Sequence, residues 1–305
     1  MIVLCAVFFS AFAVSLLLTV PVGKFAVYLG AVDLPSVRKV HHNPVPRMGG
    51  MAFFVGFCLS LLLCIKHAPS LCYQLLCGGS LLVALGVSDD IYTLSPYSKL
   101  PVQVFVAVVA FLIGARVESF AVFGRTVILG YTASLAASVF FIVLMINAVN
   151  FIDGLDALAA TVCLSSVCAV AFLTRVTQSG VLFVCCAMIG ALLGFLPFNM
   201  NKASIFMGDT GSTFLGYALA CMTMSAFSYE MSPSLVLCVA VPVLDVLFSV
   251  ARRLIHGKNP LKADRGHLHH FLYDMGMSQG AVVLILSVLS AALATLGVAM
   301  KIRPQ

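Results

Sequence analysis

Long apolar runs separated by short polar connections make up most of this chain. Ten runs are evident, at residues 1–20, 49–65, 71–87, 101–115, 132–149, 157–173, 180–196, 211–227, 233–251 and 281–300. Each approaches the roughly 20 residues that an α-helix needs to cross a bilayer. The pattern predicts an all-α polytopic membrane protein with about ten transmembrane helices.

Two connections add detail to this pattern. Residues 117–129 place β-branched and aromatic residues around a Gly-Arg pair, which predicts either a short extracytoplasmic β-hairpin or a plain loop. Pro242 interrupts the ninth run shortly before Asp245, so a break or kink is expected there. Residues 1–20 lack a basic region and a convincing cleavage site, and we interpret them as a retained first helix.

Composition agrees with a membrane protein. Of the 305 residues, 62% are hydrophobic and 9% are charged, whereas a soluble domain has roughly 25% charged residues. No stretch is long or polar enough for a separate soluble domain, so residues 1–305 are expected to form one domain. The 11 cysteines lie mostly inside apolar runs and form no CxxC pair, which favours small core side chains over disulfides or metal ligands.

Charge predicts the orientation of the bundle. Counted by connection, 11 of the 17 basic residues fall on one side, and the positive-inside rule makes that side cytoplasmic, with both termini outside. The same topology puts nine of the 11 acidic residues on the cytoplasmic side and leaves Glu118 and Glu230 outside. Ionisable groups near a bilayer are costly, so acids gathered at one face indicate a metal or phosphate site.

Asp89 and Asp90 follow the third apolar run. Neighbours on a helix point about 100° apart, so one carboxylate can face a metal while the other faces a second reactant. Lys99 follows shortly afterwards and could supply a charge for phosphate. The alternative is a helix end that carries solvated acids.

A polar set recurs at every third residue after the fifth run: Asn147, Asn150, Asp153 and Asp156. On a helix these residues share one face, although Gly154 favours a partly looped turn. Two amides and two carboxylates can bind a cation, a sugar or the edge of a base. Asp156 could also be the N-cap of the next helix.

Asp209 lies where the eighth run begins, among Gly208, Gly211 and Gly216. A helix N-terminus favours phosphate, and a carboxylate placed there suits a bridging cation. A simple cap and turn is the alternative interpretation of this segment.

Two basic connections complete the candidate chemistry. His267, His269 and His270 follow Arg265, and Arg47 ends a loop rich in proline and histidine. An H-x-H-H spacing could suggest zinc, but cationic surroundings without a nearby cysteine favour phosphate or diphosphate as the ligand. A basic loop on anionic lipid headgroups is the alternative.

Together these segments resemble the polyprenyl-phosphate N-acetylhexosamine-1-phosphate transferases (glycosyltransferase family 4), integral membrane enzymes that begin cell-envelope glycan assembly. The resemblance runs from about residue 34 to 276 and rests on PSVRKVHHNPVPRMGG, DDIYTLSPYSKL, NFIDGLDALA, FNMNKASIFMGDTGS, PVLDVLFSVARR and DRGHLHH. DRGHLHH, PVPRMGG and the short chain are most similar to the undecaprenyl-phosphate N-acetylglucosamine branch. The phospho-MurNAc-pentapeptide branch typically shows three consecutive histidines instead. Ala157 departs from the glycine that the family often has at this position.

The resemblance implies a role for each candidate residue. Catalytic roles are expected for Asp89, Asp90, Asp153, His267, His269 and His270. Substrate contacts are expected from Arg47, Lys99, Asn147, Asn150, Gly154, Leu155, Asp156, Asn199, Phe206 and Arg265. Asp209 and Asp90 would bind Mg²⁺, or Mn²⁺ in its place. Uracil would stack on Phe206 beside Asp156, and Lys99 would steady the lipid phosphate.

The implied reaction joins undecaprenyl phosphate to the sugar-linked phosphorus of UDP-GlcNAc and expels UMP. It would be the first membrane step of a cell-envelope glycan such as teichoic acid or lipopolysaccharide. Both reactants are anions, so Mg²⁺ and the basic loops would screen their charges. Asp89 is the preferred base, because repulsion from Asp90 would favour its protonated form. One in-line displacement is expected, and an aspartyl-phosphate intermediate is the alternative.

The expected location is the bacterial cytoplasmic membrane, with the active site facing the cytoplasm. UDP-GlcNAc, undecaprenyl phosphate and the bilayer are the expected partners, a homodimer would be unsurprising for the family, and no nucleic-acid partner is expected. A phospho-MurNAc-pentapeptide transferase is one alternative. A transporter or lipid flippase that uses Asp245 is another, although the acids gather at one face rather than along a path. A silent lipid-binding scaffold is the third.

Overall fold

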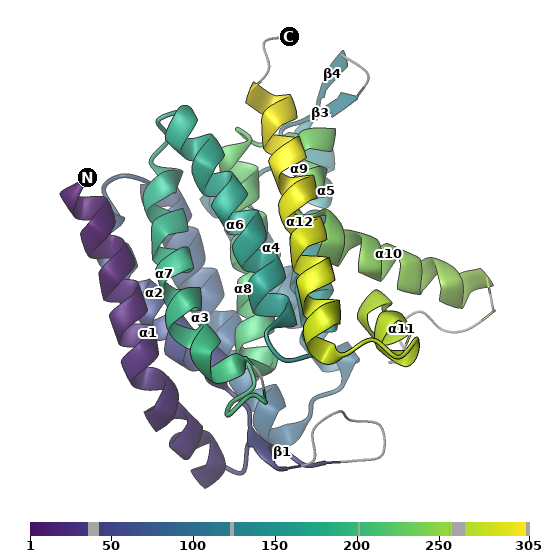
Figure 1. Ribbon diagram of the computed structural model, residues 1–305. Helices are drawn as coiled ribbons and strands as arrows, with labels where there is room; N and C mark the ends of the chain where they lie inside the picture. The colour runs from purple at the N-terminus through teal and green to yellow at the C-terminus, as the bar shows by residue number, and fades with distance from the viewer. Residues whose placement is uncertain (36–42, 123–124, 201, 256, 258–265, 303–305) are drawn as a thin grey trace.

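The computed structural model describes residues 1–35, 43–122, 125–200, 202–255, 257 and 266–302. Long helices run side by side, and the start of α1 and the end of α12 lie at the same end of the bundle (Figure 1). The helices are α1 (Ile2–Tyr28), α2 (Gly49–Cys64), α3 (Pro69–Tyr92), α4 (Pro96–Ile113), α5 (Tyr131–Ile152), α6 (Leu158–Val176), α7 (Val181–Asn199), α8 (Gly208–Ala226), α9 (Pro233–Cys238), α10 (Ala240–Ile255), α11 (Leu268–Asp274) and α12 (Gln279–Ile302). The all-α polytopic architecture is therefore confirmed.

The number of membrane-spanning helices is lower than expected. All ten apolar runs form helices, but 7 helices of the described chain are long and apolar enough to cross a bilayer: α1, α3, α4, α5, α6, α7 and α12. Helix α2 is apolar but has only 16 residues. Helix α8 is rich in glycine, serine and threonine, and the ninth run is broken into α9 and α10. Ten was too high because apolar run length does not distinguish a straight span from a short or divided one.

Helix α8 forms the centre of the bundle and packs against α2, α3, α5, α6 and α7. Almost every residue of α8 is buried, so its neighbours are protein side chains rather than lipid. Small residues allow this packing: a Cβ atom on Gly50 of α2 would clash with Gly211, and one on Gly86 of α3 would clash with Thr210. Close approach through small residues is typical of helices packed within membranes.

The ninth apolar run changes direction. Helix α9 ends at Cys238, and α10 begins at Ala240 and projects sideways from the bundle (Figure 1). The predicted break is confirmed, and it lies between Cys238 and Ala240, just before Pro242. Proline is tolerated in the first turn of a helix, where its missing N–H leaves no bond unmade. The short helix α11 lies close to the foot of α12 and brings the histidines back toward the bundle.

Two small sheets flank the helices at opposite ends. Of the two alternatives for residues 117–129, the structure shows the hairpin rather than the plain loop: β3 (Ser119–Val122) pairs antiparallel with β4 (Arg125–Ile128). The short β5 (Glu230–Met231) adds a parallel strand beside β3, which the sequence pattern did not predict. At the other end, β1 (Val32–Asp33) pairs with β2 (Val45–Pro46). This second pair anchors the loop that leads into α2.

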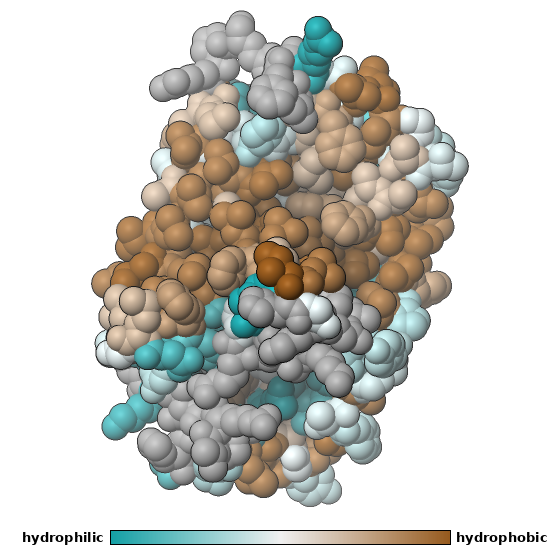
Figure 2. Space-filling view, turned by 90° about the vertical axis from the view of Figure 1, so that its right-hand side faces the viewer, coloured by the Kyte–Doolittle hydropathy of each residue, from teal (hydrophilic) through white to brown (hydrophobic). Residues whose placement is uncertain are grey.

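The polar residues divide between the two ends of the bundle. Figure 2 shows a broad band of apolar side chains across the middle of one face of the molecule, with polar residues above and below it. Glu118 and Glu230 lie with the three-stranded sheet, where Lys301 Nζ binds Glu230 Oε1 at 3.1 Å. The acids of α3 and of the α8 N-terminus lie at the opposite end. The predicted separation of the two groups of acids is therefore confirmed for these residues.

Candidate active site

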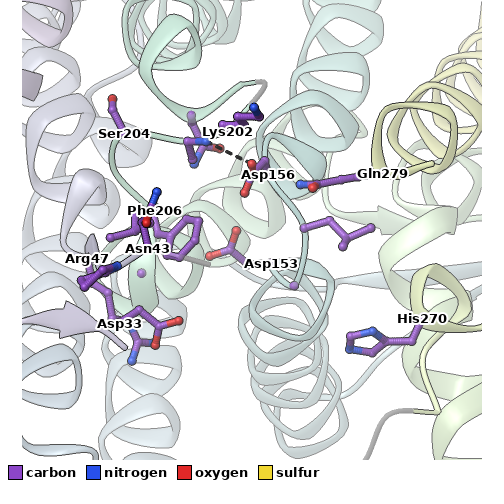
Figure 3. A pocket seen from close by; sticks show the side chains of 17 residues that line it. Asp33, Asn43, Arg47, Asp153, Asp156, Lys202, Ser204, Phe206, His270 and Gln279 are labelled. Atoms are coloured by element: carbon purple, nitrogen blue, oxygen red, sulfur yellow. Dashed lines mark hydrogen bonds between the residues drawn. The ribbon is translucent and has the colours of Figure 1, made fainter. Parts of the chain in front are cut away.

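A cleft of about 890 Å³ opens at the end of the bundle where α7 ends and α8 begins. Its walls come from the β1–β2 segment, the α5–α6 turn, the α7–α8 connection and the start of α12. The lining residues are Asp33, Asn43, Pro44, Val45, Arg47, Asp153, Gly154, Leu155, Asp156, Asn199, Lys202, Ala203, Ser204, Phe206, Gly208, His270 and Gln279. In Figure 3 the side chains of Asp153 and Phe206 point into the space between these walls.

Asp90 holds the N-terminus of α8. Its carboxylate oxygens accept hydrogen bonds from the backbone N–H of Asp209 (3.0 Å) and of Thr210 (3.1 Å), and from Thr210 Oγ1 (2.6 Å). Arg47 Nε lies 3.2 Å from Asp90 Oδ1, and the Asp90 side chain is 0% exposed. Both carboxylate oxygens therefore already have donors, which speaks against the prediction that Asp90 binds the metal.

Gly208 makes this arrangement possible. It has a positive φ of 71°, and a Cβ atom at this position would clash with the Asp90 carboxylate. Glycine adopts positive φ without the steric cost that other residues incur. The residue before Asp209 is thus fixed both by backbone conformation and by the neighbouring acid.

Asp209 lies between two cations. Lys99 Nζ is 2.7 Å from Asp209 Oδ2 and 3.1 Å from Asp89 Oδ2, so the lysine joins α3, α4 and α8. Arg47 Nη2 is 3.7 Å from Asp209 Oδ1. Burial by itself would lower the pKa of Arg47, but the Asp90 and Asp209 carboxylates outweigh it and raise that pKa. Arg47 therefore stays charged in the cleft.

Asp153 differs from the other acids. No hydrogen bond or ion pair joins its carboxylate to another side chain in the described part of the chain, and it faces the cleft (Figure 3). Desolvation and the negative charge of Asp209 raise the pKa of Asp153 well above its usual value. Such a shift marks a carboxylate whose natural partner is a cation or a proton.

Asn199, which was predicted to contact the substrate, holds two loops of the cleft wall together. Its side-chain oxygen accepts from Ala157 N (3.0 Å), and its amide donates to the Ile205 carbonyl (3.0 Å). Asp156 Oδ2 accepts from Ala203 N at 3.0 Å, which joins the α5–α6 turn to the α7–α8 connection. These contacts hold the two loops at a fixed separation.

The alternative that Asp156 is an N-cap is wrong. The residue before α6 is Ala157, with a positive φ of 63° and no side-chain cap. A left-handed backbone is easier for glycine than for alanine. The conformation therefore suits the glycine that the family often has at this position, and Ala157 adopts it at a cost in backbone strain.

The two asparagines of α5 have separate partners. Asn150 Nδ2 donates to Ser212 Oγ at 2.9 Å and so lies against the first turn of α8. Asn147 is one turn further from the cleft, where its amide donates to Gln103 Oε1 at 2.8 Å. The cleft lining includes neither asparagine; Asn150 contacts α8 near the cleft, whereas Asn147 is turned toward Gln103 of α4, so the structure does not support its predicted contact with substrate.

The three histidines are not equivalent. His267 Nδ1 lies 2.7 Å from Asp245 Oδ2, and Asp245 Oδ1 also accepts from Leu268 N at 2.5 Å. His270 lines the cleft, whereas His269 is 1% exposed and lies against Gly154. Burial first, and then the charge of His270, lower the pKa of His269 to about 3.

The structure adds residues that the sequence did not single out. Asp245 orients His267, and Asn43, Lys202, Ser204 and Gln279 line the cleft. Asp245 was noted as an acid near the membrane, and its place after a proline inside an apolar run was the available signal. The predicted site residue Arg265 lies outside the described residues.

The fold and the cleft together define a polytopic membrane protein with a paired set of acids and cations at one end of its bundle. Residues 72–227 match the family model described as glycosyl transferase family 4.

Curated proteins of several bacteria are similar over most of the chain. A probable undecaprenyl-phosphate N-acetylglucosaminyl 1-phosphate transferase of Bacillus subtilis is 36% identical over 293 residues, covering 90% of this chain and 80% of that protein. A decaprenyl-phosphate N-acetylglucosaminephosphotransferase of Mycolicibacterium smegmatis is 34% identical, with 86% and 73% covered. The undecaprenyl-phosphate alpha-N-acetylglucosaminyl 1-phosphate transferase of Escherichia coli is 28% identical, with 90% and 78% covered. The chain belongs to glycosyl transferase family 4 and is a membrane-embedded transferase.

Proposed function

We propose that this protein transfers N-acetylglucosamine-1-phosphate from UDP-GlcNAc to undecaprenyl phosphate and releases UMP. The observation that carries the proposal is the cluster of Asp89, Asp90, Asp153 and Asp209 around Arg47 and Lys99, at the boundary of an apolar bundle. A site in this place can admit a nucleotide from water and a lipid phosphate from the bilayer. The names of the relatives support this choice of substrates.

The acid cluster fits a divalent cation. Four carboxylates face two basic side chains, so the fully ionised cluster has two negative charges in excess. No set of three His, Cys, Asp or Glu side chains is arranged as a metal site in the described ranges. Mg²⁺ commonly takes one or two carboxylates and completes its shell with phosphate oxygens and water.

We assign Mg²⁺, or Mn²⁺, to Asp209 and Asp153, and give Asp90 a positioning role. Asp153 lines the cleft, and Asp209 lies beside it, with its Oδ1 3.7 Å from Nη2 of the cleft residue Arg47, whereas the oxygens of Asp90 are taken by the α8 N-terminus. The cation would polarise phosphate oxygens and offset negative charge in the transition state.

The basic side chains of the chain itself would bring two anions together. Arg47 lines the cleft, and Lys99 lies between Asp89 and Asp209 with its ammonium group directed at the site. In the proposed step an oxygen of the lipid phosphate attacks the sugar-linked phosphorus, and the bond from that phosphorus to the bridging oxygen of UMP breaks. A phosphate monoester is mostly dianionic at about pH 7, so little proton removal is needed, and Asp89 or Asp153 can accept the remaining proton.

The far wall of the cleft would hold the nucleotide. Leu155, Asp156 and Phe206 lie around a recess whose position is fixed by Asn199. A flat aromatic ring beside a carboxylate and backbone amides suits a pyrimidine, through stacking and hydrogen bonds to its edge. His270, on the opposite side in Figure 3, would contact the diphosphate or the sugar.

The cellular setting is part of the same proposal. The cleft would face the cytoplasm of a bacterium, where UDP-sugars are made, and the product would enter a cell-envelope glycan. A homodimer and the lack of a nucleic-acid partner remain predictions.

The test is UMP release by the purified protein with undecaprenyl phosphate and Mg²⁺. UDP-GlcNAc is expected to support turnover, and UDP-MurNAc-pentapeptide is not. Asp209→Asn should reduce turnover at least about 100-fold, as loss of a group that stabilises transition-state charge commonly does.

Glu230→Gln, at the opposite end of the bundle, is the matched control and should keep full activity. Turnover with the pentapeptide substrate alone would overturn the proposed branch. Full activity in Asp209→Asn would overturn the metal assignment.

A further inference from the structure

A second hollow, of about 680 Å³, lies at the end of the bundle opposite the active-site cleft. It is formed by the α2–α3 connection and the α6–α7 connection; the latter is at the top of Figure 1. The lining residues are Lys66, His67, Arg175, Gln178, Ser179, Gly180, Leu182 and Phe183. The proposed transfer reaction uses none of them.

The two connections are held firmly against each other. The His67 ring stacks flat on Phe183, with centroids 3.9 Å apart and planes 5° apart. A Cβ atom on Gly180 would clash with the His67 carbonyl oxygen. The basic residues therefore occupy fixed loops rather than independent surface tails.

Charge in this hollow is uncompensated. Its lining contains Lys66, Arg175 and a histidine but no acid, and neither cation has an ion-pair partner in the described part of the chain. Two other cations at this end are engaged: Lys301 binds Glu230 at 3.1 Å, and Arg116 donates to the Phe111 carbonyl at 3.2 Å. The hollow therefore brings two cations, which have no ion-pair partner among the described residues, together with the Ser179 hydroxyl and the Gln178 amide. Such a set of donors can bind the oxygens of a phosphate.

Exposed apolar side chains lie one turn below the cations. Leu62, in the last turn of α2, is 60% exposed and lies four residues before Lys66, and Phe172 is 60% exposed on the same face of α6 as Arg175. Helix α7 packs against both α2 and α6, the helices that carry these two side chains. A ligand that fits both parts needs an anionic head and a hydrocarbon chain.

We propose that this hollow binds the headgroup phosphate of an anionic phospholipid. Lys66 and Arg175 contact the phosphate, Gln178 and Ser179 offer hydrogen bonds, and the acyl chains lie against Leu62 and Phe172. Lysine and arginine near a membrane surface attract anionic headgroups in this way. The proposal is independent of the transferase substrates.

The experiment uses the full-length protein in an uncharged detergent. Bound lipid is counted by native mass spectrometry during titration with phosphatidylglycerol or phosphatidylcholine, with inorganic phosphate as a competitor. Phosphatidylglycerol should bind in preference to phosphatidylcholine. Lys66→Gln and Arg175→Gln should each weaken its binding roughly fivefold, and their effects should multiply in the double variant.

Arg125→Gln, an exposed arginine of β4 at the same end, is the matched control and should bind the lipid normally. UMP release should be unchanged in the double variant, which shows that it is folded. Equal binding of the two lipids, or wild-type binding by the double variant, would overturn the proposal. Displacement of the lipid by millimolar phosphate would also overturn it, because the site would then be one for free anions.

Discussion

The neighbouring carboxylates of Asp89 and Asp90 have different partners and therefore different structural roles. Asp90 is enclosed by the α8 N-terminus and Arg47, so its carboxylate holds the start of α8 in place. Asp89 shares Lys99 with Asp209, and its other oxygen accepts from Leu94 N at 2.7 Å. Removing the Asp90 carboxylate would leave the backbone N–H groups of the α8 N-terminus without their acceptor, which is costly, whereas Lys99 would keep Asp209 as its partner after removal of Asp89.

His269 provides a pH-dependent test at this scale. Its pKa in the folded protein is about 3, against roughly 6.5 for an unfolded chain. Between these values the folded state binds fewer protons, so its stability falls as the pH decreases. At pH 5 the loss is about 2 kcal/mol.

Thermal unfolding in detergent at pH 7.5 and pH 5 measures this effect. His269→Phe should lose less stability between these two pH values than the wild type does. His67→Phe, which removes an exposed histidine, should behave like the wild type. An equal decrease in His269→Phe and the wild type would contradict the inferred burial of a neutral imidazole.

At the scale of elements, α8 is the support on which the site is built. Its N-terminus carries Asp209, its first turn contacts Asn150, and its buried length contacts most of the bundle. The hydroxyl groups of Ser212, Thr213 and Thr223 bond to carbonyls one turn earlier in the same helix, and those of Thr210 and Tyr217 bond to α3. This internal bonding allows a helix with many polar residues to lie at the centre of a membrane protein.

Gly208→Ala tests the junction at the start of α8. A side chain at positive φ costs about 1–2 kcal/mol, and the clash with Asp90 would displace the helix N-terminus as well. We expect a lower unfolding temperature and a loss of UMP release.

Gly280→Ala is the control for this variant. Gly280 lies near the start of α12, and a Cβ atom there would meet nothing within 4 Å. This variant should be at least as stable as the wild type, because alanine is the better helix former. Equal behaviour of the two variants would show that the α8 junction tolerates a side chain.

At the scale of the whole molecule, the bundle separates two polar ends. The cleft with its acids lies at one end, and the three-stranded sheet and the proposed lipid site lie at the other. This difference between the two ends suits an enzyme whose water-soluble substrate reaches only one face of the bilayer.

Cysteine labelling in intact cells tests the proposed sidedness. Thr126→Cys lies on exposed β4, and Tyr97→Cys is exposed beside the start of α4. A membrane-impermeant maleimide should label Thr126→Cys in intact cells, and should label Tyr97→Cys after permeabilisation. Labelling of the unsubstituted chain is subtracted, and the reverse pattern would invert the assigned orientation.

Much of the site could be predicted from sequence, because each motif places its polar residues beside a helix end. Asp209 at the start of α8 and Asp153 in the turn after α5 are examples. The role of Asp90 could not be predicted, because its partners at Asp209 and Thr210 are more than a hundred residues away. The same is true of Asp245, whose partner His267 lies 22 residues further on, at the N-cap of α11.

The sequence by itself determined the class of protein, the positions of the helices and the separation of acids from the opposite end. These features depend on apolar length and on charge near helix ends, which are local properties of the chain. The tertiary structure decided which carboxylate holds a helix N-terminus, which histidines are buried and which helices can span a bilayer. Those outcomes depend on contacts between segments far apart in sequence, and local periodicity does not specify them.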